Sequence, residues 1–347
     1  MYKYAFLDRD GTLVFEPQDT FQVDSIEKLR ILDGVIDGLQ KLILDGYKLV
    51  MVTNQNGIGS VQFPLRNFEE PQEKLLKILR ENGVLFEEIF VCPHFKEDDC
   101  ACRKPKTGLV DNFFREKEID LENSFMCGDR ETDREFAENL GIKYLRMSCN
   151  GSFPRFSRIS RNTTETEIFV AANLDGIGDY KISTGIGFFD HMLELFSKNS
   201  LIDLEITSIG DLNIDEHHTV EDTGIVLGQA LSQALGNKRG IERYGFLLPM
   251  DESLAEVAID LSGRPCLQWN VDFQRERIGE MPTELFEEFF KALSDNLQAA
   301  IHVNLRYGKN DHHKIEAVFK AFGRALKSAV RRDDRIKDLL PSTKGKL

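Results

Sequence analysis

Two clusters in the second half of the chain repeat one arrangement of metal-binding side chains. Each cluster reads His-His-x-x-Glu, and the six residues are His217, His218 and Glu221, then His312, His313 and Glu316. Because the chain has only seven histidines, packing alone is a poor explanation for four of them in two similar clusters. Imidazole and carboxylate ligands together suit Mn²⁺, Zn²⁺, Fe²⁺ or Co²⁺, and the sequence does not choose among these ions.

The spacing inside each cluster predicts two ions. An apolar stripe follows each cluster, so we expect each cluster to open a helix. Residues three or four apart share a helix face, whereas adjacent side chains point about 100° apart. One histidine of each pair should therefore join its own glutamate, and the other should reach a second ion. His191 and His302 are expected to complete the two sites.

A second kind of site is predicted near the N-terminus, in the stretch Asp8-Arg9-Asp10-Gly11-Thr12. Two carboxylates just after a buried strand can share Mg²⁺, whose charge offsets their repulsion. A carboxylate held in this way beside a phosphate is suited to act as a nucleophile. An EF-hand loop is excluded, because Leu13 and Asp19 stand where that loop needs glycine and glutamate. A simple Asp-Gly turn remains the alternative for the pentapeptide alone.

Four metal-binding side chains lie within one short segment, namely Cys92, His94, Cys100 and Cys102. Three thiolates and one imidazole match a tetrahedral Zn²⁺ site with all four positions filled, which is typical of a structural ion. The alternative is a loop with three incidental cysteines. Since the segment leads directly into Lys104, we expect the ion to position that lysine and to take no part in the chemistry.

These side chains need a scaffold, and the first half of the chain alternates strand and helix patterns. Strands are predicted at residues 4–8, 47–54, 86–93, 123–129 and 142–148, and helices at residues 26–46, 71–83 and 132–141. Apolar strands between helices indicate an α/β, Rossmann-like fold with a parallel sheet covered on both faces. Chemistry in such sheets collects at the carboxyl ends of the strands. Four of the strands end in polar residues: Asp8 and Asp10, Thr53 and Asn54, the loop of Cys92 and His94, and Asp129.

The pattern changes after Met147. Residues 148–161 are polar and basic and contain glycine and proline, as an inter-domain linker should. Domains are therefore predicted at residues 1–147 and 162–347. The second domain reads as an α+β duplication, with two small sheets that are each backed by helices.

The two copies can be aligned on their landmarks. Strands at residues 165–176 and 203–211 correspond to strands at 253–263 and 302–310, and helices open at Phe188-Phe189 and Phe289-Phe290. Each copy should be a strand–strand–helix–strand–helix unit that ends in its His-His-x-x-Glu helix. On this alignment Ala292 stands opposite His191, and Asp203 or Leu204 stands opposite His302. The two ion sites should therefore resemble each other in ligand type but use different segments.

Composition limits the possible partners. The formal charge is −14 over 347 residues, without a basic stripe, which disfavours nucleic-acid binding. No run of 18 apolar residues and no basic-then-apolar N-terminus occurs. We therefore expect a cytoplasmic protein without a membrane span.

The N-terminal motifs resemble those of the haloacid-dehalogenase-type (HAD) phosphatases. The four family motifs occur in order at strand ends: residues 8–12, Thr53, Lys104 and GDRETD at residues 128–133. The resemblance implies that Asp8 is the nucleophile, which forms an aspartyl-phosphate, and that Asp10 is the general acid and base. The other roles that it implies are phosphoryl contacts from Thr53 and Lys104, a substrate contact from Asn54, and a Mg²⁺ site of Asp8, Asp10 and Asp129 with Asp133 as indirect support.

The stretches GIGFFDHM, GDLNIDEHHTVED, IDLSGRP and KNDHHKIEAVFKAFGRAL resemble imidazoleglycerol-phosphate dehydratase. That family carries two Mn²⁺ ions, and the implied ligands are His191, His217, His218, Glu221, His302, His312, His313 and Glu316. A family acid/base glutamate falls on Glu165. Family phosphate contacts fall on Arg243, Arg264, Ser342 and Lys344, although Thr343 departs from the usual PSSKG motif. The family also assembles into a 24-subunit shell with metals at subunit contacts.

Together the two resemblances cover the whole chain. The chain is therefore similar to the bifunctional histidinol-phosphatase/imidazoleglycerol-phosphate dehydratases of histidine biosynthesis. Dehydration must remove a proton from a carbon that has no adjacent carbonyl. The substrate's imidazole would then act as the electron sink, as an imidazolate stabilised by one metal ion at each ring nitrogen.

Two alternatives remain: a phosphatase for another sugar phosphate, and a metal-storage or metal-sensing protein with an inert phosphatase-like domain. The intact motif set argues against inertness, and the fused dehydratase favours histidinol phosphate.

Overall fold

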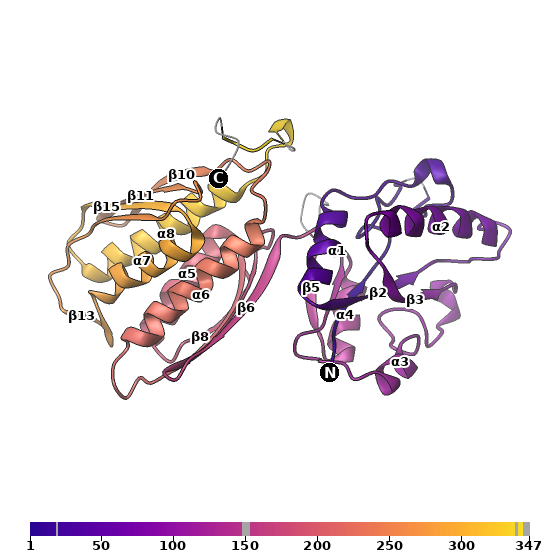
Figure 1. Ribbon diagram of the computed structural model, residues 1–347, viewed down its shortest axis with the longest axis horizontal. Coiled ribbons are helices and arrows are strands. Elements are labelled where there is room, and N and C mark those ends of the chain that lie inside the picture. The colour runs from indigo at the N-terminus through magenta and orange to yellow at the C-terminus, as the bar shows by residue number, and fades with distance from the viewer. Residues whose placement is uncertain (19, 148–152, 337–338, 343–347) are drawn as a thin grey trace. The chain divides into compact units, whose positions relative to one another are not determined.

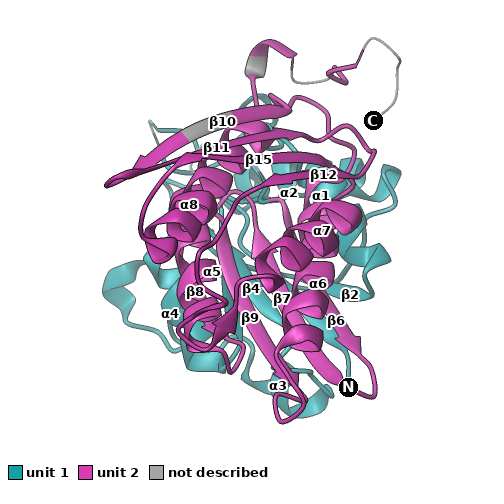
Figure 2. Ribbon diagram, turned by 90° about the vertical axis from the view of Figure 1, so that its left-hand side faces the viewer, with its two compact units in different colours: residues 1–154 teal, residues 155–347 magenta. Residues whose placement is uncertain are grey.

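The computed structural model describes residues 1–18, 20–147, 153–336 and 339–342. The chain divides into two compact units, residues 1–154 (unit 1) and residues 155–347 (unit 2), which are coloured separately in Figure 2. Each unit has its own hydrophobic core. Within the described residues, no helix is long and apolar enough to cross a membrane.

Unit 1 contains a parallel sheet of five strands in the order β3-β2-β1-β4-β5; Figure 1 labels β2, β3 and β5. The strands are β1 (Lys3–Leu7), β2 (Tyr47–Asn54), β3 (Phe86–Cys92), β4 (Phe125–Gly128) and β5 (Lys143–Arg146). All five predicted strands are present within one or two residues of their expected bounds. Asp8, Lys104 and Asp129 follow β1, β3 and β4 in the chain, so the α/β prediction is confirmed and the polar residues gather at one edge of the sheet.

The helices of unit 1 differ more from the prediction. They are α1 (Val35–Leu44), α2 (Leu65–Glu81), α3 (Asp111–Glu116) and α4 (Glu131–Leu140), with short 3-10 turns at Ile26–Lys28 and Lys96–Asp98. The predicted helix at 26–46 is therefore too long, and α2 begins six residues before Pro71, where a helix start was expected. The earlier start brings the Phe68 ring against Phe63 and the Arg9 guanidinium. This packing outweighs the preference of proline for a first turn.

Unit 2 contains two four-stranded sheets with the same topology, in the orders β6-β7-β9-β8 and β10-β11-β15-β12. The first sheet is built from β6 (Phe156–Asn162), β7 (Thr166–Asn173), β8 (Tyr180–Ser183) and β9 (Asp203–Gly210). The second is built from β10 (Tyr244–Met250), β11 (Ser253–Asp260), β12 (Cys266–Asn270) and β15 (Ala300–Tyr307). In both sheets the last strand of the order pairs in parallel and the others are antiparallel. The duplication is therefore present in the backbone.

The α-helices described in unit 2 form a layer between its two sheets (Figure 1). They are α5 (Gly187–Ser200), α6 (His217–Leu235), α7 (Leu285–Leu297) and α8 (Asp311–Val330). The apolar stripes of α6 and α8 are buried in one shared core. Each repeat has three strands before its first helix, so the expected two-strand unit is one strand short. A small hairpin, β13 (Arg277–Ile278) and β14 (Met281–Pro282), is added in the second repeat and has no counterpart among the described residues of the first.

The missing strand explains a difference at the domain boundary. Residues 156–161, which the sequence assigns to a linker, form most of β6 and pair with β7. The Ser157 hydroxyl donates to the carbonyl of Ala230, and Arg155 binds the Asp175 carboxylate at 2.7 Å. The compact units divide between Pro154 and Arg155. Polar composition suggested a linker here because an edge strand with one solvated face is also polar.

The structure also corrects the alignment of the two repeats. Ser197 and Ser294 make the same hydrogen bond from Oγ to a carbonyl five residues later, at 2.8 Å in both helices. Counting back six residues from each serine pairs His191 with Glu288, not with Ala292. Ala171 of β7 and Ala258 of β11 occupy the same position in their strands, and they pair with Glu205 and His302 respectively. His302 is therefore equivalent to Glu205, not to Asp203 or Leu204. The expectation that His191 and His302 have no equivalent histidine in the other repeat is correct. The residues that were expected to be equivalent to them were wrong.

Candidate active sites and metal centres

Lys104 lies at the centre of the site in unit 1. Its Nζ donates to Asp8 Oδ1 at 2.8 Å, to Asp133 Oδ1 at 2.6 Å and to the carbonyl oxygen of Val52 at 2.8 Å. All three side chains are buried. Burial lowers the pKa of Lys104, but the carboxylates of Asp8 and Asp133 more than offset this, so the pKa is raised. The lysine is therefore charged at neutral pH and can hold an anion beside Asp8.

The carboxylate of Asp10 is held by two side chains that the sequence analysis did not single out as site residues. Arg9 Nη1 donates to Oδ1 at 3.0 Å, and Gln55 Nε2 donates to Oδ2 at 2.7 Å. Burial raises the pKa of Asp10, and Arg9 and Gln55 only partly reverse this rise. A carboxyl group with a raised pKa is suited to proton transfer.

Thr53 and Asn54 end β2 on the same side of the pocket. Gln55 Nε2, which contacts Asp10, also donates to Thr53 Oγ1 at 2.9 Å. The Asn54 side chain binds the main chain of Lys104 twice, accepting from its N–H at 3.0 Å and donating to its carbonyl at 3.1 Å. Asn54 therefore holds the lysine in place in addition to lining the pocket.

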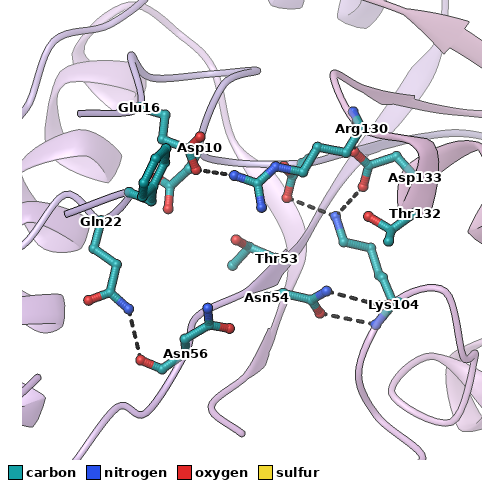
Figure 3. A pocket seen from close by; sticks show the side chains of 12 residues that line it. Asp10, Glu16, Gln22, Thr53, Asn54, Asn56, Lys104, Arg130, Thr132 and Asp133 are labelled. Atoms are coloured by element: carbon teal, nitrogen blue, oxygen red, sulfur yellow. Dashed lines mark hydrogen bonds and ion pairs between the residues drawn. The ribbon is translucent and has the colours of Figure 1, made fainter. Parts of the chain in front are cut away.

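Figure 3 shows the pocket, in which Lys104 reaches toward Asp133 and Arg130 points toward Glu16. Glu16 and Arg130 form an ion pair, and Gln22 and Asn56 line the pocket beside them. Arg130 lies inside the GDRETD motif, which could have identified it. Glu16, Gln22 and Asn56 lie in loops with no chemical pattern in the sequence, so nothing in the spacing could have found them.

Three carboxylates in the pocket, from Asp8, Asp129 and Asp133, lie close enough to hold one cation. Partial burial and the neighbouring Asp8 raise the pKa of Asp129 to about 7, although the residue is exposed on one side. Gly11 permits this approach, because its φ is +79° and a Cβ there would lie 2.4 Å from Asp129 Oδ2. Oxygen-only ligands with excess negative charge fit Mg²⁺. The Asp10 side chain is outside this group, so its expected role as a Mg²⁺ ligand has no support from its carboxylate.

The four residues of the predicted zinc site come together at the end of β3. Cys102 Sγ lies 3.3 Å from Cys92 Sγ and 3.2 Å from Cys100 Sγ, and 3.1 Å from His94 Nδ1. A tetrahedral Zn²⁺ with bonds of about 2.3 Å would separate its sulfurs by about 3.8 Å, so the cluster needs only slight expansion. Burial and the neighbouring sulfurs raise the pKa of Cys102 to about 12. A bound cation would remove this opposition to thiolate formation, so these donors fit zinc.

In unit 2, His191 of α5 lies with His312 and Glu316 of α8 in a group able to hold a metal ion. His312 Nε2 is 3.4 Å from Glu316 Oε2, one helical turn away. The first repeat has the same pair, with His217 Nε2 at 3.5 Å from Glu221 Oε2. The first histidine of each cluster therefore faces its own glutamate, as the spacing predicted.

The second histidine of each cluster points elsewhere, and its ring is nearly perpendicular to that of the first. His218 Nδ1 lies 3.1 Å from Asp211, and His313 Nδ1 lies 2.8 Å from Glu252. His302 is exposed on β15. Of the ligands expected from the sequence, the part of unit 2 that the structure describes gathers only His191, His312 and Glu316 into a group of three.

The remaining predicted residues of unit 2 are spread over several loops. Glu165 lies just before β7, with Oε2 3.8 Å from His218 Nε2. Arg243 binds the Asp260 carboxylate and donates to the carbonyl of Pro341 at 2.9 Å, which brings the last described residues, including Ser342, to the same edge. Arg264 is exposed. Lys344 lies outside the described residues.

Comparison with known proteins gives matches to both units. A family model described as polynucleotide kinase 3 phosphatase matches residues 3–147, and one described as imidazoleglycerol-phosphate dehydratase matches residues 184–326. The histidine biosynthesis bifunctional protein HisB of Buchnera aphidicola subsp. Schizaphis graminum is 48% identical over 99% of both chains. That of Legionella pneumophila strain Lens is 47% identical over 100% of both. The crystal structure of imidazoleglycerol-phosphate dehydratase from Staphylococcus aureus is 41% identical over 51% of this chain and 99% of its own, with a TM-score of 0.47.

Proposed function

The chain belongs to the family of bifunctional histidine biosynthesis proteins HisB, and we propose that its two units catalyse two separate reactions on phosphorylated substrates. Unit 1 hydrolyses L-histidinol phosphate to L-histidinol. Unit 2 dehydrates imidazoleglycerol phosphate to imidazole acetol phosphate. The similarity over the full length of the relatives and the separate family matches to the two units support this division.

The observation that carries the phosphatase assignment is the contact of Lys104 with Asp8, beside the held carboxylate of Asp10. Asp8 attacks the phosphorus, and the bond to the substrate oxygen breaks, which leaves an aspartyl-phosphate. Asp10 gives its proton to the departing alcohol and then takes one from the water that hydrolyses the acyl phosphate. Lys104 and Thr53 hold the phosphoryl oxygens. Mg²⁺ at Asp8 and Asp129 would supply positive charge against the transferring group.

In the dehydratase reaction, Glu165 is the residue that moves a proton at the carbon chain of the substrate. A C–H bond breaks first, and the C–O bond then breaks as the electrons return from the imidazole, so that hydroxide leaves and takes up a proton to become water. Two metal ions held by the imidazole and carboxylate ligands of α5, α6, α8 and β15 would supply positive charge to the substrate's imidazole, which takes up the electrons of the broken C–H bond. Arg243, Arg264, Ser342 and Lys344 are assigned to the phosphate. The carboxylate–imidazole donor sets of α6 and α8 fit Mn²⁺.

The assembly and location follow from the same proposal. The second ligand set is incomplete in one chain, because His302 and His313 are not grouped with a second set of ligands among the described residues. This supports a homo-oligomer in which neighbouring chains complete the sites, with 24 subunits as the family resemblance implies. Zn²⁺ in unit 1 is assigned a structural role. We place the protein in the cytoplasm, where no disulfides are required of its cysteines.

One pair of variants tests the assignment. Asp8→Asn removes the nucleophile and should abolish phosphate release from L-histidinol phosphate while leaving dehydration intact. His313→Ala removes a metal ligand and should abolish dehydration while leaving phosphate release intact. Both rates are measured on wild type and on both variants, with circular dichroism as the control for folding. Loss of both activities from either change would contradict two independent sites.

A further inference from the structure

The two repeats of unit 2 place a glutamate at the same position, immediately before equivalent strands. Glu165 precedes β7 and Glu252 precedes β11. Each strand has eight residues, and they pair antiparallel with β9 and β15 respectively. The two glutamates are therefore equivalent, and each lies near the second histidine of its own cluster. Only Glu165 was expected to have a chemical role.

Their surroundings are different. Glu252 Oε2 lies 2.8 Å from His313 Nδ1, and its Oε1 accepts from the backbone N–H groups of Asn310 at 3.1 Å and Lys309 at 3.4 Å. No hydrogen bond to the Glu165 carboxylate is found among the described residues, and its side chain is 53% exposed. Glu252 is thus fixed against the start of α8, while Glu165 can change its position.

In the first repeat another carboxylate holds the histidine. The two oxygens of Asp211 lie 3.1 and 3.2 Å from His218 Nδ1. The position equivalent to Asp211 follows from the strand registers, because Ile209 and Tyr307 pair with equivalent residues of β7 and β11. Counting on two residues from each pairs Asp211 with Lys309. A lysine has no acceptor, so in the second repeat the carboxylate has to come from elsewhere.

We propose that Glu252 and Asp211 are positioning residues that bind Nδ1 of His313 and of His218 and leave Nε2 of each ring to a metal ion. A carboxylate on one ring nitrogen fixes the tautomer and orientation of a metal-binding imidazole. The two repeats take this carboxylate from different positions, Asp211 in the first and Glu252 in the second. Because Asp211 holds His218 in the first repeat, Glu165 is released from the anchoring role that its counterpart Glu252 keeps, and it is available for proton transfer. This inference rests on the proposed dehydratase function.

The test is Mn²⁺ binding by the full-length protein, stripped of metal and titrated while free Mn²⁺ is followed by electron paramagnetic resonance. Glu252→Ala and Asp211→Ala should each lower the affinity for one of the two Mn²⁺ ions per chain by about 10- to 100-fold. Glu165→Ala should leave both affinities within twofold of wild type but remove dehydration. Glu252→Gln, whose side-chain oxygen still accepts from the ring, should restore most of the affinity lost in Glu252→Ala. The matched control is Glu167→Ala, an exposed position on β7.

The outcomes are distinct. Unchanged Mn²⁺ affinity in both Glu252→Ala and Asp211→Ala, or an equal loss in Glu165→Ala, would overturn the positioning roles while leaving the proposed function standing. A wild-type protein that neither binds Mn²⁺ nor dehydrates the substrate would remove the proposed function and this inference together. If Glu252→Ala fails to fold, Glu252→Gln and Asp211→Ala still decide the question.

Discussion

At the residue scale, the phosphatase site depends on side chains outside the recognised catalytic positions. The Arg9 guanidinium is fully buried, and its Nε and Nη2 lack hydrogen-bond partners in the described part of the chain. It lies 5.2 Å from the Phe68 ring centre and donates to Asp10. Burying a cation with only part of its hydrogen-bonding capacity used is costly. This cost is consistent with a role in fixing the carboxylate of Asp10, the proposed general acid and base.

Gln55 provides the more direct test of that role. Its amide donates to the Asp10 carboxylate, which lowers the pKa of Asp10, so Gln55→Leu should raise this pKa. Loss of a hydrogen bond that an ionised carboxylate accepts favours the protonated form of that carboxylate. Asp10 then stays protonated to higher pH, and the pH–rate profile of phosphate release should move to higher pH. A pH–rate profile that superimposes on wild type would show that Gln55 does not act on Asp10, and the dehydration rate serves as the control.

Asp129 should make the proposed magnesium binding sensitive to pH. Its pKa is raised to about 7 by partial burial and by Asp8, so the carboxyl is mostly protonated below pH 7 and mostly ionised above it. Mg²⁺ must displace that proton, and its affinity should fall by up to about tenfold per pH unit below pH 7. Calorimetric titration of the metal-free protein at pH 8 and pH 6 measures this. Equal affinity at the two pH values would contradict it, and Asp129→Asn should bind weakly at both.

At the element scale, the loop from β3 to Lys104 links the proposed zinc site to the proposed phosphatase site. Arg103 Nη1 donates to Asn56 Oδ1 at 2.7 Å and to the carbonyl of His94 at 3.1 Å. Cys102 is two residues before Lys104, and the hydrogen bonds of Arg103 between them hold this segment in place. Ordering of the loop by zinc should hold Lys104 against Asp8.

Removing one zinc ligand should separate the two activities. Cys100→Ser should lower the zinc content by one equivalent per chain and reduce phosphate release by at least about tenfold, because an unanchored Lys104 loses its positioning contribution. Dehydration should be unchanged. Cys266→Ser, which alters an exposed cysteine outside the cluster, is the matched control. Full zinc content in Cys100→Ser would refute the ligand assignment, and full phosphatase activity without zinc would refute the link to Lys104.

The sequence predicted the elements of unit 2 better than their alignment. The strand and helix periods are local, so β7, β9, β11 and β15 fall close to their expected ranges. The repeat alignment used the two Phe-Phe pairs, but α7 begins at Leu285 and the structural counterpart of Phe189 is Phe286. Which aromatic of a helix fills the core depends on packing between distant segments, which no local pattern contains. The carboxylates of Asp211 and Glu252 escaped notice for the same reason.

At the scale of the whole molecule, the division into two catalytic units was predictable because each unit carries complete motifs of its own. The position of the boundary was not. The polar stretch that ends unit 1 continues into β6, and only the pairing of β6 with β7 shows that these residues belong to unit 2. Phe153 belongs to the other side, since its ring lies against Gly38 and its N–H donates to Asp33.

Two truncated chains, residues 155–347 and residues 162–347, test this boundary. The longer fragment keeps β6, the Arg155–Asp175 ion pair and the bond from Arg155 to the carbonyl of Val330. It should fold, assemble and dehydrate the substrate at close to the wild-type rate. The shorter fragment starts at the last residue of β6, so it exposes the edge of β7 and the core beneath Ser157, and an unpaired hydrophobic edge promotes aggregation. We expect it to be insoluble or to unfold at least about 10 °C lower by calorimetry, since loss of a strand exceeds the effect of a point mutation. Equal stability of the two fragments would restore the boundary near residue 161 and make β6 a dispensable extension.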